Sequence, residues 1–204
     1  KEYKVSPHTV LQKPFCNLLH FEKVNCNIKQ PKLLIVAPMA GHHATLLRDT
    51  IREMLSYADV YVTDWINACQ VPKVLGAFDM DDFIDYMIDF YKELAPNLHV
   101  MGVCQPTVPV VAASAILSAE KDVRFVPNSM ILMGGPVDAR KSPTILESFA
   151  SDLSVDWFKK YTITKVPKNF PGHGRKVYPG FMQLLGFISL NWKKHLESHI
   201  NLFQ

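Results

Sequence analysis

The chain has 204 residues, of which 48% are hydrophobic and 20% are charged, and its formal net charge is +3 at pH 7. This composition is typical of a folded globular protein and excludes a disordered or fibrous chain. The basic surplus lies in the last 54 residues, which carry eight Lys or Arg and three Asp or Glu, too sparse for a nucleic-acid interface. Because the sequence contains neither a membrane-spanning apolar segment nor a signal-peptide pattern, we expect a soluble, cytoplasmic protein.

Short apolar runs alternate with helical patterns between residues 32 and 135. The predicted strands are 33–37, 59–63, 99–103 and 129–134, and the predicted helices are 44–56, the segment between Asp79 and Pro96, and 106–119. Asp79 and Asp82 have the separation of a capping pair at a helix N-terminus. Residues 15–28 are expected to add one or two antiparallel edge strands. This alternation predicts an α/β fold with a mostly parallel sheet flanked by helices.

The character of the chain changes after about residue 141. The last 64 residues hold ten of the 22 aromatic residues and several prolines, and they contain no further convincing strand. A helix is predicted over 181–203. We therefore expect a partial core over residues 1–140 and a helical cap or lid over residues 141–204. The aromatic side chains are explained equally well by packing and by substrate contact.

The four cysteines, Cys16, Cys26, Cys69 and Cys104, are irregularly spaced, which indicates neither a zinc site nor a disulfide framework. Cys104 stands between a predicted strand and a predicted helix, two residues after Gly102. This is the context of a nucleophile elbow, and a helix N-terminus favours the thiolate form of a cysteine. Cys104 is therefore the candidate nucleophile. The alternative is a small buried apolar residue at the end of a strand.

Two features of the neighbouring loops bear on this prediction. The fixed φ of Pro106 suits the first position of the following helix. The segment 37–43 is a turn with one glycine after the first core strand, where Met39 or Ala40 could donate a backbone N–H to an oxyanion. The adjacent His42 and His43 suggest a metal only weakly, because consecutive side chains rarely converge on one ion. Neither a metal nor another cofactor is expected.

Five motifs in this order resemble those of the intracellular poly(3-hydroxybutyrate) depolymerases. They are Pro38-Met39-Ala40-Gly41-His42, Val62-Thr63-Asp64-Trp65, Gly102-Val103-Cys104-Gln105-Pro106, Met133-Gly134-Gly135-Pro136-Val137-Asp138 and Tyr178-Pro179-Gly180-Phe181. The resemblance implies an α/β-hydrolase fold in which Cys104 attacks the ester carbonyl of a hydroxyalkanoate polymer and forms an acyl-enzyme. It also implies that the backbone N–H of Gln105 is an oxyanion donor.

The family's catalytic aspartate and histidine lie beyond the cap and have no counterpart in this sequence, so we expect a C-terminally truncated chain with weak activity or none. His173 is the candidate surrogate base, and Asp138, which is equally explained as a turn residue, is the candidate acid. His195 and His199 lie four residues apart, but a solvated helix face explains that spacing better than a metal site.

Two other functions are open. The chain could be a non-catalytic module that binds a storage granule or another partner, since the cap is aromatic and the base is missing. A polyhydroxyalkanoate synthase is the third possibility, but Pro106 stands where the synthase motif has a glycine. The expected partners are hydroxyalkanoate polymer or oligomers and the granule surface. A sheet that ends at the fourth core strand would leave an unpaired edge, and the oligomeric state is open.

Overall fold

The computed structural model describes residues 3–24, 28–39, 47–121, 123–141, 143, 148 and 150–183. The chain divides into two compact units, residues 1–137 and 138–204, which are described separately below. In the described residues, no helix is both long enough and apolar enough to cross a bilayer.

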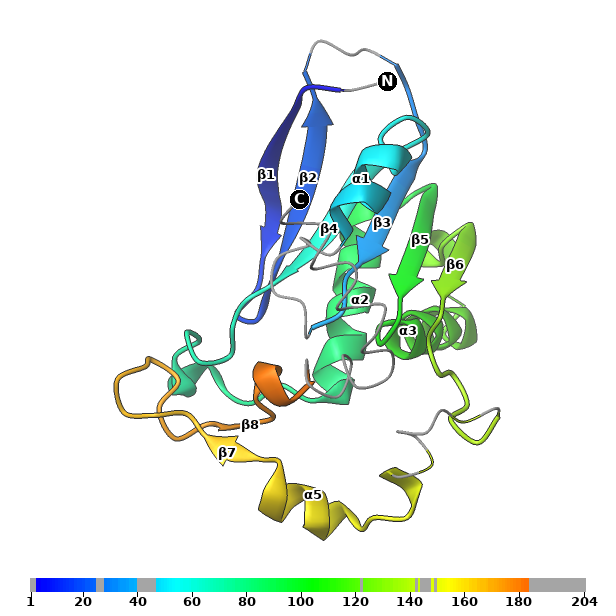
Figure 1. The fold of residues 1–204 in the computed structure, drawn as a ribbon. Helices are drawn as coiled ribbons and strands as arrows, with labels where there is room; N and C mark the ends of the chain where they lie inside the picture. The colour runs from blue at the N-terminus through cyan, green and yellow to red at the C-terminus, as the bar shows by residue number, and fades with distance from the viewer. Residues whose placement is uncertain are drawn as a thin grey trace, which may run out of the picture. The chain divides into compact units, whose positions relative to one another are not determined.

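The first unit is built on a six-stranded sheet with the strand order β1-β2-β4-β3-β5-β6 (Figure 1). The strands are β1 (Val5–Gln12), β2 (Cys16–Lys23), β3 (Lys32–Val36), β4 (Asp59–Trp65), β5 (Leu98–Val103) and β6 (Ser129–Met133). Strands β4, β3, β5 and β6 are parallel to one another, whereas β1 and β2 form an antiparallel extension beside β4. The predicted α/β fold with a mostly parallel sheet is confirmed.

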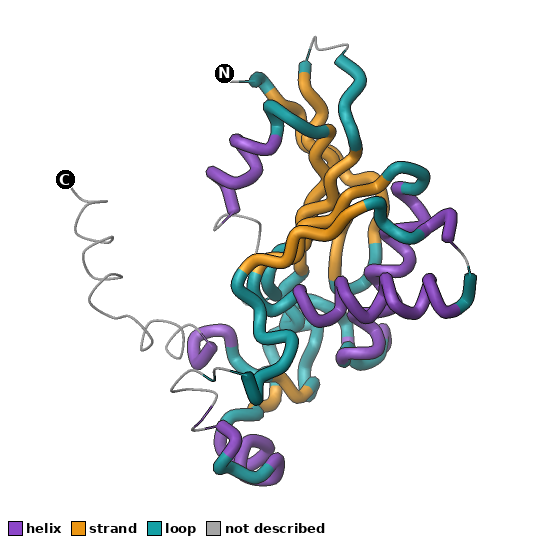
Figure 2. The backbone as a smooth tube through the Cα atoms, turned by 90° about the vertical axis from the view of Figure 1, so that its right-hand side faces the viewer, coloured by secondary structure: helices purple, strands orange, loops and turns teal. Residues whose placement is uncertain are grey.

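Helices cover both faces of this sheet. Figure 2 shows α1 (Arg48–Met54) on one face and α2 (Met80–Leu94) with α3 (Thr107–Ala119) on the other. Two 3-10 turns, η2 (Lys73–Leu75) and η3 (Val123–Phe125), lie in the connections. Because both faces are covered, β3 is apolar without alternation, and four of its five residues are buried.

The predicted capping pair is present at the start of α2. The Asp79 carboxylate accepts hydrogen bonds from the backbone N–H groups of Asp81 (3.0 Å) and Asp82 (3.2 Å), and the Asp82 carboxylate accepts from the Asp79 N–H (2.8 Å). These bonds satisfy N–H groups that have no partner within the helix. The helix buries one face, formed by Phe83, Tyr86, Met87, Phe90, Tyr91 and Leu94.

The edge strands differ from the prediction. Strand β2 falls within the predicted segment 15–28, but β1, at residues 5–12, was not expected. Most of β1 is exposed, it contains Pro7, and its register shifts between Thr9 and Leu11. Because β1 is largely polar, it lacks the apolar pattern by which strands are recognised in a sequence.

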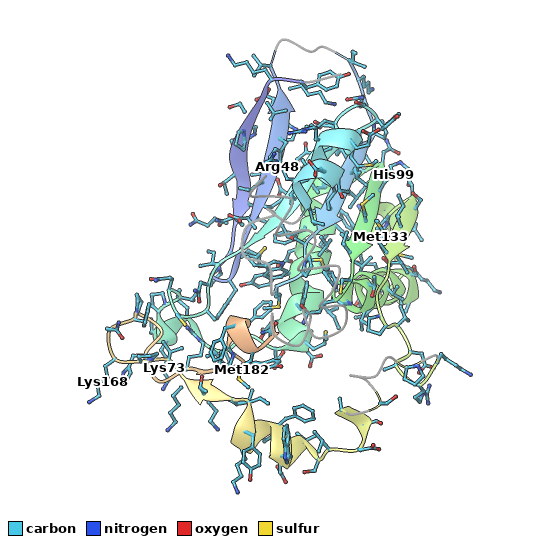
Figure 3. The ribbon with its side chains drawn as sticks, in the orientation of Figure 1. Arg48, Lys73, His99, Met133, Lys168 and Met182 are labelled. Carbon is cyan, nitrogen blue, oxygen red and sulfur yellow. The ribbon has the colours of Figure 1, made fainter. Side chains whose placement is uncertain are left out.

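The second unit contains α5 (Val155–Tyr161) and a two-stranded sheet of β7 (Thr164–Lys165) and β8 (Lys176–Val177). The expectation of no strand after residue 141 was therefore wrong. The hairpin is closed by backbone bonds from Val166 N–H to the Arg175 carbonyl (2.9 Å) and from Gly174 N–H to the Val166 carbonyl (2.9 Å). Its loop contains Lys168, which is labelled in Figure 3. Two-residue strands carry no detectable pattern in a sequence.

Most of the predicted helix 181–203 lies outside the described residues, as do His195 and His199. A cap that covers the end of the sheet stays a prediction.

Candidate active site

Cys104 lies in the turn between β5 and α3, where its backbone φ is +64° and its side chain is exposed. A non-glycine residue rarely adopts a positive φ, and this conformation costs free energy that the surrounding structure must supply. The strained strand-to-helix turn predicted for a nucleophile elbow is thus present at this cysteine. By contrast, Cys16 is buried, and burial raises the pKa of its thiol well above the ordinary value.

Hydrogen bonds from both sides hold the elbow in this conformation. The Cys104 N–H donates to the carbonyl oxygen of Met133 at the end of β6 (2.7 Å; Met133 is labelled in Figure 3). Its own carbonyl oxygen accepts from the backbone N–H (3.1 Å) and the hydroxyl (3.0 Å) of the buried Thr107. These three bonds fix the peptide groups on both sides of the thiol.

Two glycines allow the surrounding chain to approach the elbow. A Cβ at Gly102 would lie 3.3 Å from the Thr107 Cα, which is tighter than ordinary packing. A Cβ at Gly135 would overlap the Thr107 side chain and the Cys104 carbonyl oxygen. The sequence indicated a role for Gly102 in the elbow, but it included Gly135 only as part of the motif Met133-Gly134-Gly135-Pro136-Val137-Asp138, without a role.

The helix after the elbow begins one residue later than predicted. Helix α3 starts at Thr107, and Pro106 is its N-cap with φ −66° rather than its first residue. Helix boundaries commonly shift by one residue, and a proline costs no hydrogen bond at either position. Pro109 lies in the first turn, as expected, and is buried.

The loop after β3 reaches the residue that follows the nucleophile. The Met39 N–H donates to the Gln105 side-chain oxygen (3.3 Å), so the predicted oxyanion donor lies within one side chain's reach of the elbow. Gln105 itself is exposed. The alternative donor Ala40 lies outside the described residues, as do His42 and His43.

Asp138 and His173, the two weaker candidates, both belong to the second unit. The Asp138 carboxylate binds Arg140, accepting from Nε (2.8 Å) and Nη2 (3.0 Å), and these bonds lower its pKa. These bonds within one turn account for Asp138 as a structural turn residue. His173 is exposed in the β7–β8 loop, where its backbone N–H donates to Phe170 (3.0 Å). Their catalytic roles stay predictions.

Within the described part of the chain, no three His, Cys, Asp or Glu side chains are grouped so that they could hold a metal ion. No donor set for a metal can therefore be assigned there.

The fold of this chain, a mostly parallel sheet flanked by helices, is similar to that of solved structures. The N-formylmaleamic acid deformylase of Pseudomonas putida matches with a TM-score of 0.50 and 16% identity over 76% of this chain and 54% of its own. The Francisella virulence factor BioJ matches with a TM-score of 0.49 and 10% identity, over 78% of this chain and 54% of its own. The ester hydrolase EH1AB1 from the Lake Arreo metagenome matches with a TM-score of 0.48 and 17% identity, over 78% of this chain and 55% of its own. This chain thus spans about half the length of the solved structures that it matches.

A comparison with models of protein families gives a match. Residues 134–204 match the family described as the PHB de-polymerase C-terminus. None of the curated proteins matches the chain. This match confirms, over residues 134–204, the resemblance to poly(3-hydroxybutyrate) depolymerases that the motifs predicted.

Proposed function

We propose that this chain is a carboxylic ester hydrolase of the polyhydroxybutyrate depolymerase type, with Cys104 as its nucleophile. The observation that carries the proposal is the exposed Cys104 side chain on a positive-φ turn between a buried strand and a helix. The family match over residues 134–204 supports a hydroxyalkanoate polymer or its oligomers as the substrate. Such a polymer is stored in cytoplasmic granules, whose surface is the proposed site of action.

In the proposed reaction, the Cys104 thiolate attacks the carbonyl carbon of the ester, and the π electrons of the carbonyl move onto its oxygen. Backbone N–H groups of Gln105 and of Met39 or Ala40 stabilise this oxyanion. Collapse of the tetrahedral intermediate breaks the C–O bond, and the departing alkoxide takes a proton to become an alcohol. Water then hydrolyses the thioester, which releases the hydroxy acid and returns the thiol.

Turnover is proposed to be slow in this chain. Among the hydrogen bonds of the described residues, none joins the Cys104 thiol to an imidazole or a carboxylate. Where no base reaches the thiol, solvent alone deprotonates it, and solvent alone activates the water that hydrolyses the thioester. We therefore expect acylation to outpace hydrolysis.

The second candidate function is a non-catalytic module that binds the granule surface. Exposed aromatic side chains in the second unit favour it, namely Tyr161, Tyr178 and Phe181. Aromatic side chains with large apolar area are typical contacts of binding surfaces.

The two functions are separated by incubating the chain with amorphous poly(3-hydroxybutyrate) granules, and measuring released 3-hydroxybutyrate and the protein that sediments with the granules. A hydrolase releases product only with Cys104 intact, and added imidazole increases the release because it supplies the base. A binding module sediments equally as the parent and as Cys104→Ala, without product. Release that Cys104→Ala leaves unchanged would refute the proposed nucleophile.

A further inference from the structure

Two side chains of β4 end on the same residue of the loop that leads to Met39. Thr63 and Trp65 lie two residues apart, on one face of the strand, and both are buried. The Ala37 N–H donates to the Thr63 hydroxyl oxygen (2.9 Å), and the Trp65 indole N–H donates to the Ala37 carbonyl oxygen (2.7 Å). One residue thus has both backbone polar groups bound by side chains from a neighbouring strand.

These bonds begin where the backbone pairing stops. The β3–β4 register ends at Ile35 and Val62, and β3 itself ends at Val36. Beyond that point, a buried N–H and a buried carbonyl at Ala37 would lack partners, which is costly in a protein interior. The side chains of Thr63 and Trp65 supply the hydrogen bonds that a neighbouring strand would otherwise make to Ala37. They thus extend the ordered backbone of β3 by one residue.

Ala37, which these hydrogen bonds hold, lies two residues before Met39, the proposed oxyanion donor. Pro38 lies between Ala37 and Met39, and its ring fixes φ, so the one free backbone rotation between the anchored Ala37 carbonyl and the Met39 N–H is ψ of Pro38. The Met39 N–H in turn reaches the Gln105 side chain beside the nucleophile. An N–H group stabilises an oxyanion only if it is held in place before the charge develops.

We propose that Thr63 and Trp65 are positioning residues for the oxyanion site: they hold Ala37 so that the Met39 N–H, which donates to the Gln105 side-chain oxygen in this structure, stays beside the nucleophile and can turn to the oxyanion. The inference rests on the proposed function, because Met39 matters to catalysis only if an oxyanion forms. It gives a role to two residues of the Val62-Thr63-Asp64-Trp65 motif that the reaction scheme does not use.

Conservative variants separate positioning from packing. Trp65→Phe removes the indole donor but keeps a ring against Phe83, whose centroid lies 4.6 Å from that of Trp65. Thr63→Val keeps the side-chain shape but removes the acceptor, and Thr63→Ser retains the hydroxyl. Each variant is compared with the parent 204-residue chain.

The test compares two reactions of the same thiol. Acylation of Cys104 by p-nitrophenyl butyrate forms an oxyanion, whereas its alkylation by iodoacetamide does not, so only the first depends on the Met39 donor. We expect acylation to fall about 10- to 100-fold in Thr63→Val and in Trp65→Phe, with alkylation unchanged and Thr63→Ser close to the parent. Acylation at the parent rate in both Thr63→Val and Trp65→Phe would overturn the inference.

A second measurement keeps the inference testable if the parent chain is not acylated, a result that would refute the proposed function alone. Hydrogen exchange of the Met39 amide reports directly on the loop. We expect exchange to become at least about tenfold faster in Thr63→Val, with Thr63→Ser like the parent. Unchanged exchange at Met39 in Thr63→Val would refute the positioning role, whatever the chemistry of Cys104.

Discussion

At Gly135 the chain passes so close to the elbow that a side chain would collide with Thr107 and with the Cys104 carbonyl oxygen. We predict that Gly135→Ala lowers the free energy of unfolding by about 3 kcal/mol, the upper range of over-packing effects. Gly134→Ala is the matched control, because its φ is +61° but nothing lies within 4 Å of its Cβ position. It should cost only about 1 kcal/mol. Urea unfolding measures both values, and equal losses would show that the contact with the elbow is unimportant.

Residue roles could be predicted from the sequence only where the pattern is local. Cys104 was predicted as the candidate nucleophile because a strand, a glycine, the cysteine and a helix start follow one another within a few residues. The anchoring by Thr63 and Trp65 joins residues 26 and 28 positions apart, and nothing in the sequence says that their side chains meet Ala37. The motif Val62-Thr63-Asp64-Trp65 indicated the family resemblance, but it did not indicate which residues these side chains contact.

At the scale of elements, the capping box of α2 allows a direct test. Removing the Asp79 carboxylate leaves two N–H groups at the helix start without their partner. We predict that Asp79→Ala lowers the free energy of unfolding by about 1 kcal/mol. Asp81→Ala, which removes a first-turn charge but no capping acceptor, should cost only about 0.3 kcal/mol. Chemical denaturation distinguishes the two, and a larger loss for Asp81→Ala would contradict the capping assignment.

Strand β2 makes the stability of the first unit depend on pH. Burial, with a smaller effect of the Asp64 charge, raises the pKa of the Cys16 thiol well above its ordinary value of 9.0. The unfolded chain therefore loses this proton at a lower pH than the folded chain. The contribution of Cys16 is complete below pH 9.0 and is lost as the pH rises above that value.

The expected loss is at most about 1.4 kcal/mol per pH unit for this single group. Urea unfolding at a series of pH values on both sides of 9.0 measures it, and Cys16→Ala should flatten the slope. An identical slope in the parent and in Cys16→Ala would exclude this thiol as its cause. Tyr91, whose pKa burial also raises, adds its own loss only above pH 10.0.

The elements that could be predicted are those that carry a continuous apolar run, and these include β6, which is exposed. Strands β3, β4 and β5 lie inside the sheet, and their apolar runs identified them to within a few residues. Strand β1 is mostly exposed and has no continuous apolar run, and β7 and β8 have only two residues each. None of the three therefore has a hydrophobic pattern from which a strand can be predicted. Helix α1 is shorter than the predicted 44–56, although residues 44–46 lie outside the described part.

Among the described strands of the molecule, β6 is an edge of the sheet. Within the described strands it pairs only with β5, and Met130, Ile131, Leu132 and Met133 are each more than 40% exposed. An apolar edge strand without charge, proline or bulge promotes pairing with another chain. The opposite edge, β1, is protected by Pro7 and a register shift.

We predict that this chain self-associates through β6 and that Ile131→Lys reduces the association. Val74→Lys is the control, because it introduces the same charge at an apolar side chain that is 90% exposed but far from the sheet edge in sequence. Sedimentation velocity at several protein concentrations gives the result. If both variants associate to the same extent as the parent, the β6 edge is not the contact.

We predict that Cys104 is a nucleophile toward hydroxyalkanoate esters. Mass spectrometry of the chain after reaction with p-nitrophenyl 3-hydroxybutyrate, followed by peptide mapping, tests it most directly. We predict one 3-hydroxybutyryl group, carried by Cys104 and lost in Cys104→Ala, with the buried Cys16 unmodified. A folded chain that iodoacetamide labels at Cys104 but that the ester does not acylate there would contradict the account.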